Sequence, residues 1–276
     1  MKSQIDLHIH SKYSDGEKSV DDLISLLKEK NISTFSITDH DNIDSVKYLS
    51  NKKLNNLKYI SGVEISSYYK KYGIHILGYY IDGNTYKLEK LLNNINSKRK
   101  KRMKEILKKI KIRDNITISN DDMDLLMNSN NIGKKNLSKI LIKNNIGTNY
   151  LEIRENYLKN LHCKTSYRAN IKKVCKCIED SSGIPVLAHP KEYELRYKIK
   201  IEDIIEELIK CGIKGIEVYH SIHTDKDIIR YLNVANKYNL LISGGSDYHG
   251  NNGTELGILT KKDYEIAYNT FNVVKK

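Results

Sequence analysis

The sequence has no tryptophan, two phenylalanines and two prolines among its 276 residues, and 39% of its residues are hydrophobic. No stretch approaches the roughly 20 consecutive apolar residues that span a bilayer. Asp6 and the histidines beside it interrupt the first apolar run, so we expect no signal peptide. These absences predict a cytoplasmic protein with no membrane partner, and no pattern predicts an obligate protein partner.

Cysteine is scarce and badly spaced for structural chemistry. The four cysteines are Cys163, Cys175, Cys177 and Cys211, and none forms a Cys-x-x-Cys pair. Disulfide frameworks and cysteine-type zinc sites need paired or regularly spaced thiols. The pattern therefore favours reduced thiols and argues against both kinds of site.

Acidic residues are outnumbered, since 47 Lys and Arg face 34 Asp and Glu for a formal net charge of +13. A basic surface favours polyanionic partners such as nucleic acid or phosphorylated substrates. Solvated lysine faces are the other interpretation, and the abundance of Lys, Asn, Ile and Tyr is also typical of an AT-rich genome. The run of five basic residues at 98–102 has both interpretations open: contact with RNA phosphates, or a solvated helix face.

The order of apolar patterns predicts an α/β body with an insertion. Strand-like and helix-like runs alternate up to about residue 80 and again from about residue 184, which is typical of βαβ units in a mostly parallel sheet or barrel. Between them lies a long basic helix, at 84–112, and a segment of short helices and loops without strand alternation. The expected division is residues 1–96 and 168–276 for the body and residues 97–167 for a helical insertion that caps the substrate.

Metal-capable side chains follow the predicted strands. His8 and His10 are two apart on the first strand, so they project to the same face, and Asp15 follows in the next loop. In parallel α/β folds the carboxyl ends of the strands meet at one edge, where sites are built. The residues expected at that edge, which include six of the nine histidines, are His8, His10, Asp15, His40, Glu64, His75, His189, Asp247 and His249.

Nine His and carboxylate groups are too many for one ion and suit two or three. Without cysteine among them, the donor set favours Mn²⁺, Zn²⁺ or Fe²⁺. Ions about 3.5–4 Å apart are typical of phosphoryl chemistry. The sequence therefore predicts a hydrolytic metal centre whose partner is a phosphorylated small molecule or a short nucleic acid.

Seven short motifs resemble, in order, those of the PHP (polymerase and histidinol phosphatase) superfamily. They are DLHIH at 6–10, SDG at 14–16, TDHD at 38–41, GVE at 62–64, HILGY at 75–79, AHP at 188–190 and GSDYHG at 245–250. Within it the chain is most similar to stand-alone phosphoesterases of nucleoside 3',5'-bisphosphates and of the 5' ends of short RNA. The resemblance implies a distorted (β/α)₇ barrel with a trinuclear metal site.

Carried over by motif, the resemblance implies three ion positions. The first uses His8, His10, Glu64 and Asp247, the second Asp15, His40 and His249, and the third Glu64, His75 and His189. It also implies that the nucleophile is a metal-bound hydroxide held by Glu64, Asp247 and His189.

The insertion departs from the family pattern. Similar proteins carry a Gly-Arg-Pro-His run that helps to bind substrate phosphates, whereas this chain has GKKNLSK at 133–139. Lysine keeps the charge but loses the bidentate guanidinium fork. The candidate substrate-binding residues are Lys134, Asn136, Lys139, Arg168 and His220.

The expected function is metal-dependent hydrolysis of phosphomonoester or phosphodiester bonds of nucleotides. Two alternatives stay open. One is a phosphatase of another small molecule, such as histidinol phosphate. The other is a catalytically idle, metal-stabilised module that binds nucleic acid.

Overall fold

A computed structural model describes residues 4–161, 163–250 and 254–257. The described residues up to Leu92 and from Arg168 onward form one compact unit, and Asn93–Tyr167 form a second. The predicted boundary at residue 97 and the structural boundary at Asn93 both fall within helix α3 (Tyr86–Asp114). That helix runs without a break because no glycine or proline interrupts residues 86–114.

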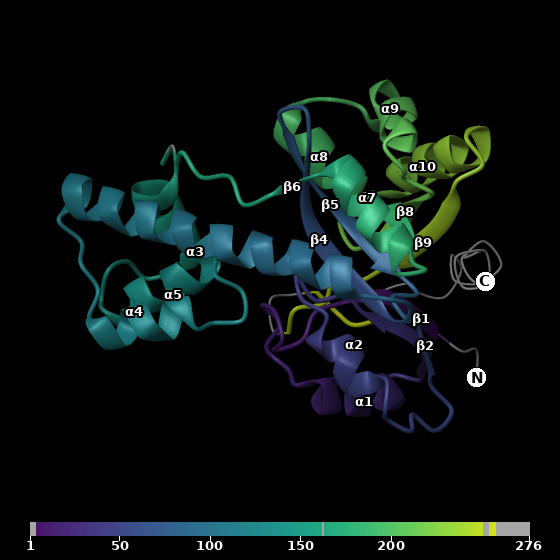
Figure 1. Ribbon diagram of the computed structural model, residues 1–276, viewed down its shortest axis with the longest axis horizontal. Helices are drawn as coiled ribbons and strands as arrows, with labels where there is room; N and C mark the ends of the chain where they lie inside the picture. The colour runs from purple at the N-terminus through teal and green to yellow at the C-terminus, as the bar shows by residue number, and fades with distance from the viewer. Residues whose placement is uncertain (1–3, 162, 251–253, 258–276) are drawn as a thin grey trace. The chain divides into compact units, whose positions relative to one another are not determined.

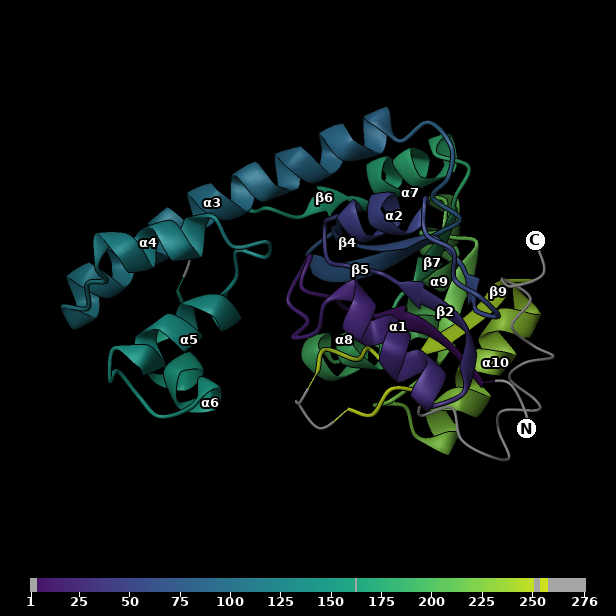
Figure 2. The same cartoon turned by 90° about the horizontal axis from the view of Figure 1, so that it is seen from below.

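The first unit contains two sheets (Figures 1 and 2). The three-stranded sheet has the order β1 (Gln4–Ile9), β2 (Ile32–Ile37), β3 (Lys58–Tyr59). The six-stranded sheet has the order β6 (Ala169–Asn170), β4 (Gly62–Tyr69), β5 (Tyr72–Tyr79), β7 (Ile184–Leu187), β8 (Gly215–His220), β9 (Leu241–Gly245). Isolated parallel bridges, Ile9 to Tyr248 and His40 to Glu64, join the two sheets at two seams.

The α/β class expected from the sequence is confirmed, but β4 and β5 do not follow the expected alternation of parallel strands and helices. The apolar pattern of residues 59–66 predicts one strand, but the structure divides this segment between β3 and β4, which belong to different sheets. β4 and β5 pair in antiparallel fashion, because only Lys70 and Lys71 connect them and so short a connection can join only antiparallel strands. β5 also pairs antiparallel with β7, whereas the remaining pairs are parallel.

Helices cover the sheets of the first unit. Their bounds are α1 (Val20–Glu29), α2 (Asp44–Leu49), α7 (Ile171–Asp180), α8 (Pro190–Tyr197), α9 (Ile205–Lys210) and α10 (Asp225–Lys237), with a short 3₁₀ turn η2 (Ile201–Asp203). α1 packs on β2, α7 on β4, β5 and β7, and α10 on β8 and β9 (Figure 2). α8 was not predicted; it begins at Pro190, whose fixed φ suits the first turn of a helix.

The second unit has its own apolar core. Beside the C-terminal part of α3 it contains α4 (Asn120–Met127), α5 (Lys134–Lys143), α6 (Tyr150–Ile153) and a π-helical turn η1 (Arg154–Leu158). Its core includes Ile106 and Ile110 of α3, Leu126 of α4, and Leu137 and Leu141 of α5. No strand occurs within residues 93–161 or 163–167.

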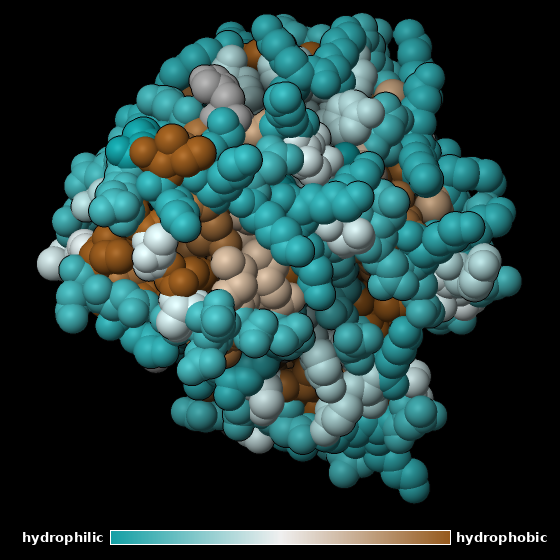
Figure 3. All heavy atoms as spheres, turned by 60° about the vertical axis from the view of Figure 1, so that its left-hand side comes forward, coloured by the Kyte–Doolittle hydropathy of each residue, from teal (hydrophilic) through white to brown (hydrophobic). Residues whose placement is uncertain are grey.

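Hydrophilic side chains dominate the face shown in Figure 3, with apolar side chains gathered in separate patches. Among the helices that the structure describes, none combines the length and the apolar character needed to cross a membrane. From the sequence we also expect the segment after the last predicted strand to form a closing strand and helix, and this segment lies mostly outside the described residues.

Candidate metal centre

His8 on strand β1 and His10 directly after it are fully buried and lie close together. The ring centroids of His8 and His10 lie 5.2 Å apart. His8 Nε2 lies 3.3 Å from Glu64 Oε2 and 3.4 Å from Asp247 Oδ1. His10 Nε2 lies 3.2 Å and 3.1 Å from the same two oxygens. These four side chains, grouped in the first ion position by resemblance, therefore place their donor atoms around one point.

A second group forms where the loop after β1 meets the chain beyond β9. Asp15 Oδ1 lies 3.2 Å from His249 Nε2, 4.0 Å from His40 Nε2 and 3.9 Å from His10 Nδ1. The second ion position was expected to use Asp15, His40 and His249. The structure adds His10 to that group, so this histidine stands between two positions.

Glu64 is the shared member of the remaining contacts. Its Oε1 lies 2.8 Å from His75 Nδ1 and 2.9 Å from His189 Nε2, the residues expected at the third position. The structure also brings Glu192 near this end, with Oε2 3.2 Å from His189 Nδ1. One oxygen of Glu64 thus faces His75 and His189, and the other faces the first position.

Buried polar atoms without hydrogen-bond partners converge on these groups. They are His8 Nε2, His10 Nε2, Asp15 Oδ1, His40 Nδ1, Glu64 Oε2 and His189 Nδ1. Buried polar atoms are normally satisfied, and imidazole nitrogens with carboxylate oxygens are suitable ligands for Mn²⁺, Zn²⁺ or Fe²⁺. The donor set therefore fits divalent cations.

The electrostatics point the same way. Burial alone would lower the pKa of His10, but Asp247 and Glu64 outweigh burial and raise that pKa to about 10. Burial alone would raise the pKa of Glu64, yet His40 and the other histidines hold it well below its usual range. The carboxylates of this cluster therefore stay ionised, and bound cations would supply the positive charge that favours this state.

Two members of the cluster have unusual backbone geometry. His189 has φ of 23° and Asp247 has φ of 56°, in the left-handed region that residues other than glycine seldom adopt. Both stand in the short segments just after strands β7 and β9. Strain of this kind persists where the surroundings fix it, and such residues cluster at functional sites.

Sequence reasoning missed Glu217, which lies on β8 and is fully buried. Its Oε1 is 2.9 Å from His8 Nδ1, and its Oε2 accepts a hydrogen bond of 2.7 Å from the backbone N–H of His189. The sequence does contain an indication of its role. Burying a charged residue without partners costs free energy, so a glutamate within the apolar run Gly215–His220 is expected to have partners.

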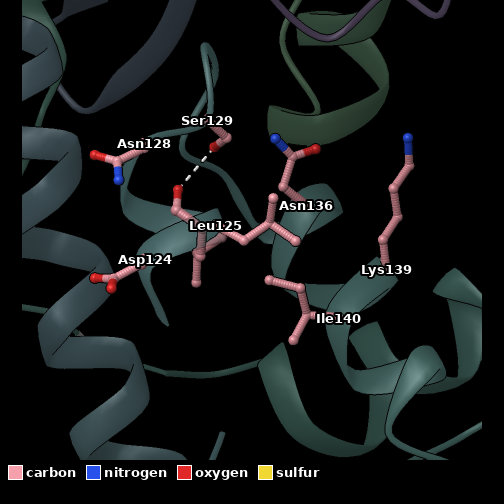
Figure 4. Close-up of a pocket in the computed structure, with 8 residues that line it drawn as sticks. Asp124, Leu125, Asn128, Ser129, Asn136, Lys139 and Ile140 are labelled. Atoms are coloured by element: carbon pink, nitrogen blue, oxygen red, sulfur yellow. Dashed lines mark hydrogen bonds between the residues drawn. The ribbon is translucent and has the colours of Figure 1, made fainter. Parts of the chain in front are cut away.

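The candidate substrate residues of the insertion all lie in the second unit. Lys134 donates to the carbonyl of Leu158, and Asn136 Nδ2 donates to the carbonyl of Asn131 at 2.7 Å. Asn136 and Lys139 of α5 line a cavity of about 590 Å³ whose opposite wall comes from α4 (Figure 4). The other residues that line it are Asp124, Leu125, Leu126, Asn128, Ser129 and Ile140.

The other two candidates belong to the first unit. Arg168 lies across Gly73 of β5, where an added Cβ would be 2.6 Å from its Nε. His220 is buried beside the candidate ligands: its Nε2 is 3.7 Å from Asp247 Oδ2, and its Nδ1 accepts a hydrogen bond of 3.3 Å from the N–H of Ile222. Of these two candidates, His220 is the one that lies against the cluster.

The PHP domain profile matches residues 6–221. The chain belongs to the PHP domain family. This confirms the family predicted from the motifs, although Asp247 and His249 lie beyond the matched range.

Two curated relatives match shorter segments. The chain is 37% identical over 78 residues to a phosphoribosyl 1,2-cyclic phosphate 1,2-diphosphodiesterase of Eggerthella lenta, with 28% of each chain covered. It is 31% identical over 91 residues to a 3',5'-nucleoside bisphosphate phosphatase of Chromobacterium violaceum, with 32% of each chain covered. The matched segments therefore span about a third or less of these relatives.

Two solved structures share the fold over most of the chain. A Bifidobacterium adolescentis protein assigned as a metal-dependent phosphoesterase has a TM-score of 0.80 at 21% identity, covering 100% of this chain and 99% of its own. An amidohydrolase of Chromobacterium violaceum, solved with bound sulfate and no metal, has a TM-score of 0.79 at 25% identity, covering 92% and 90%.

Proposed function

We propose that this chain is a metal-dependent phosphoric ester hydrolase acting on nucleotides. The observation that carries the proposal is Glu64: one buried carboxylate faces five histidines, His8, His10 and His40 through one oxygen and His75 and His189 through the other. A shared carboxylate of this kind is suited to bridging neighbouring ions. The names of both curated relatives, each a phosphate ester hydrolase, support the same reaction class.

Two to three divalent ions would be held by the three groups described above. Asp247 and Glu64 would serve the first position, Asp15 with His249 the second, and His75 with His189 the third. When bound, such ions lower the pKa of a water and neutralise the charge of phosphate oxygens. The chain itself contributes fixed ligand positions, since His8, His10, Glu64 and His189 are buried against the core.

The fold proposal is that the two sheets are arcs of one distorted barrel and that the second unit is a cap for the substrate. The seams at Ile9 with Tyr248 and at His40 with Glu64 support the first part. The basic face of α5, with Lys134 and Lys139, supports the second by charge complementarity to phosphate. A nucleoside 3',5'-bisphosphate or the 5' end of a short RNA is the proposed substrate.

Metal analysis with a substrate panel tests this function. Purified protein would be analysed for metals, loaded with Mn²⁺, and assayed on a nucleoside 3',5'-bisphosphate, a 5'-phosphorylated oligoribonucleotide, a cyclic phosphate of a sugar and histidinol phosphate. We expect turnover of the nucleotide substrates and none in His10→Ala.

The outcomes separate the alternatives. Preference for histidinol phosphate would indicate that the protein is a phosphatase of another small molecule and not of nucleotides. Absence of turnover on the whole panel, with intact RNA binding, would show an idle binding module and refute the enzyme.

A further inference from the structure

Glu217 is a buried carboxylate that none of the three proposed ion positions uses. It lies in the middle of β8, between the strand that carries His8 and the segment that carries His189. Its exposed fraction is 0%. Its two oxygens have separate partners, His8 Nδ1 at 2.9 Å and the backbone N–H of His189 at 2.7 Å. One side chain therefore joins two candidate ligands that are 181 positions apart in the sequence (189 minus 8).

The contact with His8 decides which ring nitrogen is left for a metal. An ionised carboxylate can only accept, so His8 Nδ1 must carry the hydrogen of this bond. In the neutral ring Nε2 then keeps its lone pair, and Nε2 is the atom 3.3 Å from Glu64 Oε2 and 3.4 Å from Asp247 Oδ1. A carboxylate that binds the distal N–H of a ligating histidine fixes the tautomer and raises the basicity of the ligand.

The contact with His189 acts through the backbone. His189 has φ of 23° and precedes Pro190, and both conditions are unfavourable for an ordinary residue. Glu217 Oε2 accepts a hydrogen bond from the backbone N–H of His189. The ring Nε2 of His189 lies 2.9 Å from Glu64 Oε1. The hydrogen bond thus fixes the segment that directs the His189 ring toward Glu64.

Another interpretation is a further ion held by His8, Glu217 and His220, whose donor atoms also approach one another. Two observations weigh against it. Both oxygens of Glu217 already accept hydrogen bonds, and His220 Nδ1 accepts one from Ile222 N–H. The geometry is that of a hydrogen-bond acceptor behind the ligands.

We propose that Glu217 is a positioning residue that sets the tautomer of His8 and the backbone of His189 for metal binding. This inference rests on the metal centre of the proposed function. It concerns how tightly ions are held, so it is testable without turnover.

The decisive variant is Glu217→Gln, which keeps the size of the side chain. A glutamine has one acceptor oxygen and one NH₂ group. Either the Nδ1–H of His8 or the backbone N–H of His189 would therefore face the NH₂ group, which is itself a donor. Loss of such an outer partner typically costs about 10–100-fold in metal affinity. We expect that loss for Mn²⁺, measured by calorimetry on metal-free full-length protein, with an unchanged circular dichroism spectrum.

The matched control is Asp122→Asn in the second unit. Asp122 is also a buried carboxylate with two side-chain partners, Lys143 Nζ at 2.9 Å and Asn144 Nδ2 at 2.8 Å. The substitution Asp122→Asn should lower the melting temperature and leave Mn²⁺ affinity unchanged. Equal affinities in wild type and Glu217→Gln overturn the inference alone, whereas failure of the wild type to bind Mn²⁺ overturns both this inference and the proposed function.

A measurement on the wild type covers the case in which Glu217→Gln does not fold. In zinc-loaded protein with ¹⁵N-labelled histidine, the His8 ring should show a hydrogen on Nδ1 and none on Nε2, with the signal assigned by its loss in His8→Gln. The opposite tautomer would overturn the proposal.

Discussion

Glu64 and His40 are joined twice, once through the backbone and once through their side chains. A parallel bridge connects the two residues at a seam between the sheets, and Glu64 Oε2 lies 3.0 Å from His40 Nδ1. The N–H of Asp41 also donates to the carbonyl of Glu64 at 2.8 Å. The contact that joins the sheets therefore also sets a distance within the candidate metal centre, which makes the geometry of the site a property of the fold.

Glu64→Gln should remove metal binding and turnover together. The substitution keeps the shape but deletes the charge that holds five histidines, and an uncharged amide is a weak ligand. We expect a loss of more than about 100-fold in Mn²⁺ affinity, above the range for outer-sphere changes, measured by calorimetry. Glu179→Gln, on the exposed face of α7, makes the same chemical change in the same unit and should behave as wild type. Retained affinity in Glu64→Gln would contradict the bridging role.

Metal binding should release protons, and affinity should rise with pH. In the metal-free protein, burial would lower the pKa values of His10 and His189, but the carboxylates around them raise the values to about 10 and about 9. Both rings are then protonated at pH 7, and a metal ligand must be deprotonated. Apparent Mn²⁺ affinity should therefore climb from pH 6 to about pH 10 and level off above.

Calorimetry at pH 7 in buffers of different ionisation enthalpy measures the proton count directly. A positive release in proportion to bound metal is expected. Affinity that is independent of pH over this range would show that these histidines are neutral before the metal binds.

Removal of metal should destabilise the first unit. An ion that binds only the folded state adds about 2.7 kcal/mol at a free concentration of 100 times its Kd. It also relieves the repulsion among the neighbouring carboxylates Glu64, Asp247 and Asp15. Thermal unfolding with and without a chelator should therefore show a lower midpoint without metal, restored by added Mn²⁺. Chelator saturated beforehand with Mn²⁺ is the control, and an unchanged midpoint would argue against buried ions.

The sequence allowed the candidate ligands to be proposed because most of them stand at or just after strand ends in short motifs with fixed spacing. Glu64, near the start of β4, and His75, within β5, are the exceptions. His8 and His10 share a face through the two-residue period of a strand, and that inference needs no tertiary information. The partners of each ligand were harder to predict. His10 stands between two groups, and this sharing depends on how the loop of Asp15 folds back, which no local pattern determines.

The features that were not predicted from the sequence have physical reasons as well. Glu217 is one charge within an apolar strand, and only the folded structure shows that it accepts hydrogen bonds from His8 of β1 and from the backbone of His189 after β7. The antiparallel β4–β5 pair was hidden because Tyr59–Ser66 reads as one strand, although it changes sheet between Tyr59 and Gly62. The insertion has helical patterns but no motif that fixes what Lys134 or Lys139 contacts.

Gly245→Ala should damage the centre without touching a ligand. A Cβ at Gly245 would lie 2.3 Å from the backbone N and 2.4 Å from the Cβ of His8, so β9 and β1 would have to separate at the first ligand. Overpacking of this kind costs about 1–3 kcal/mol, and we expect a lower unfolding midpoint with weaker Mn²⁺ binding.

Gly133→Ala is the matched control for this substitution. Its new Cβ would meet only Asn131 Oδ1, at 3.9 Å, so the space is open. Gly133 is the N-cap of α5, where alanine is a poorer residue and stability should fall by about 1 kcal/mol at most. Metal affinity should fall in Gly245→Ala and stay constant in Gly133→Ala; equal affinities would mean that the centre tolerates displacement of β1, against the fixed geometry argued from Glu64 and His40.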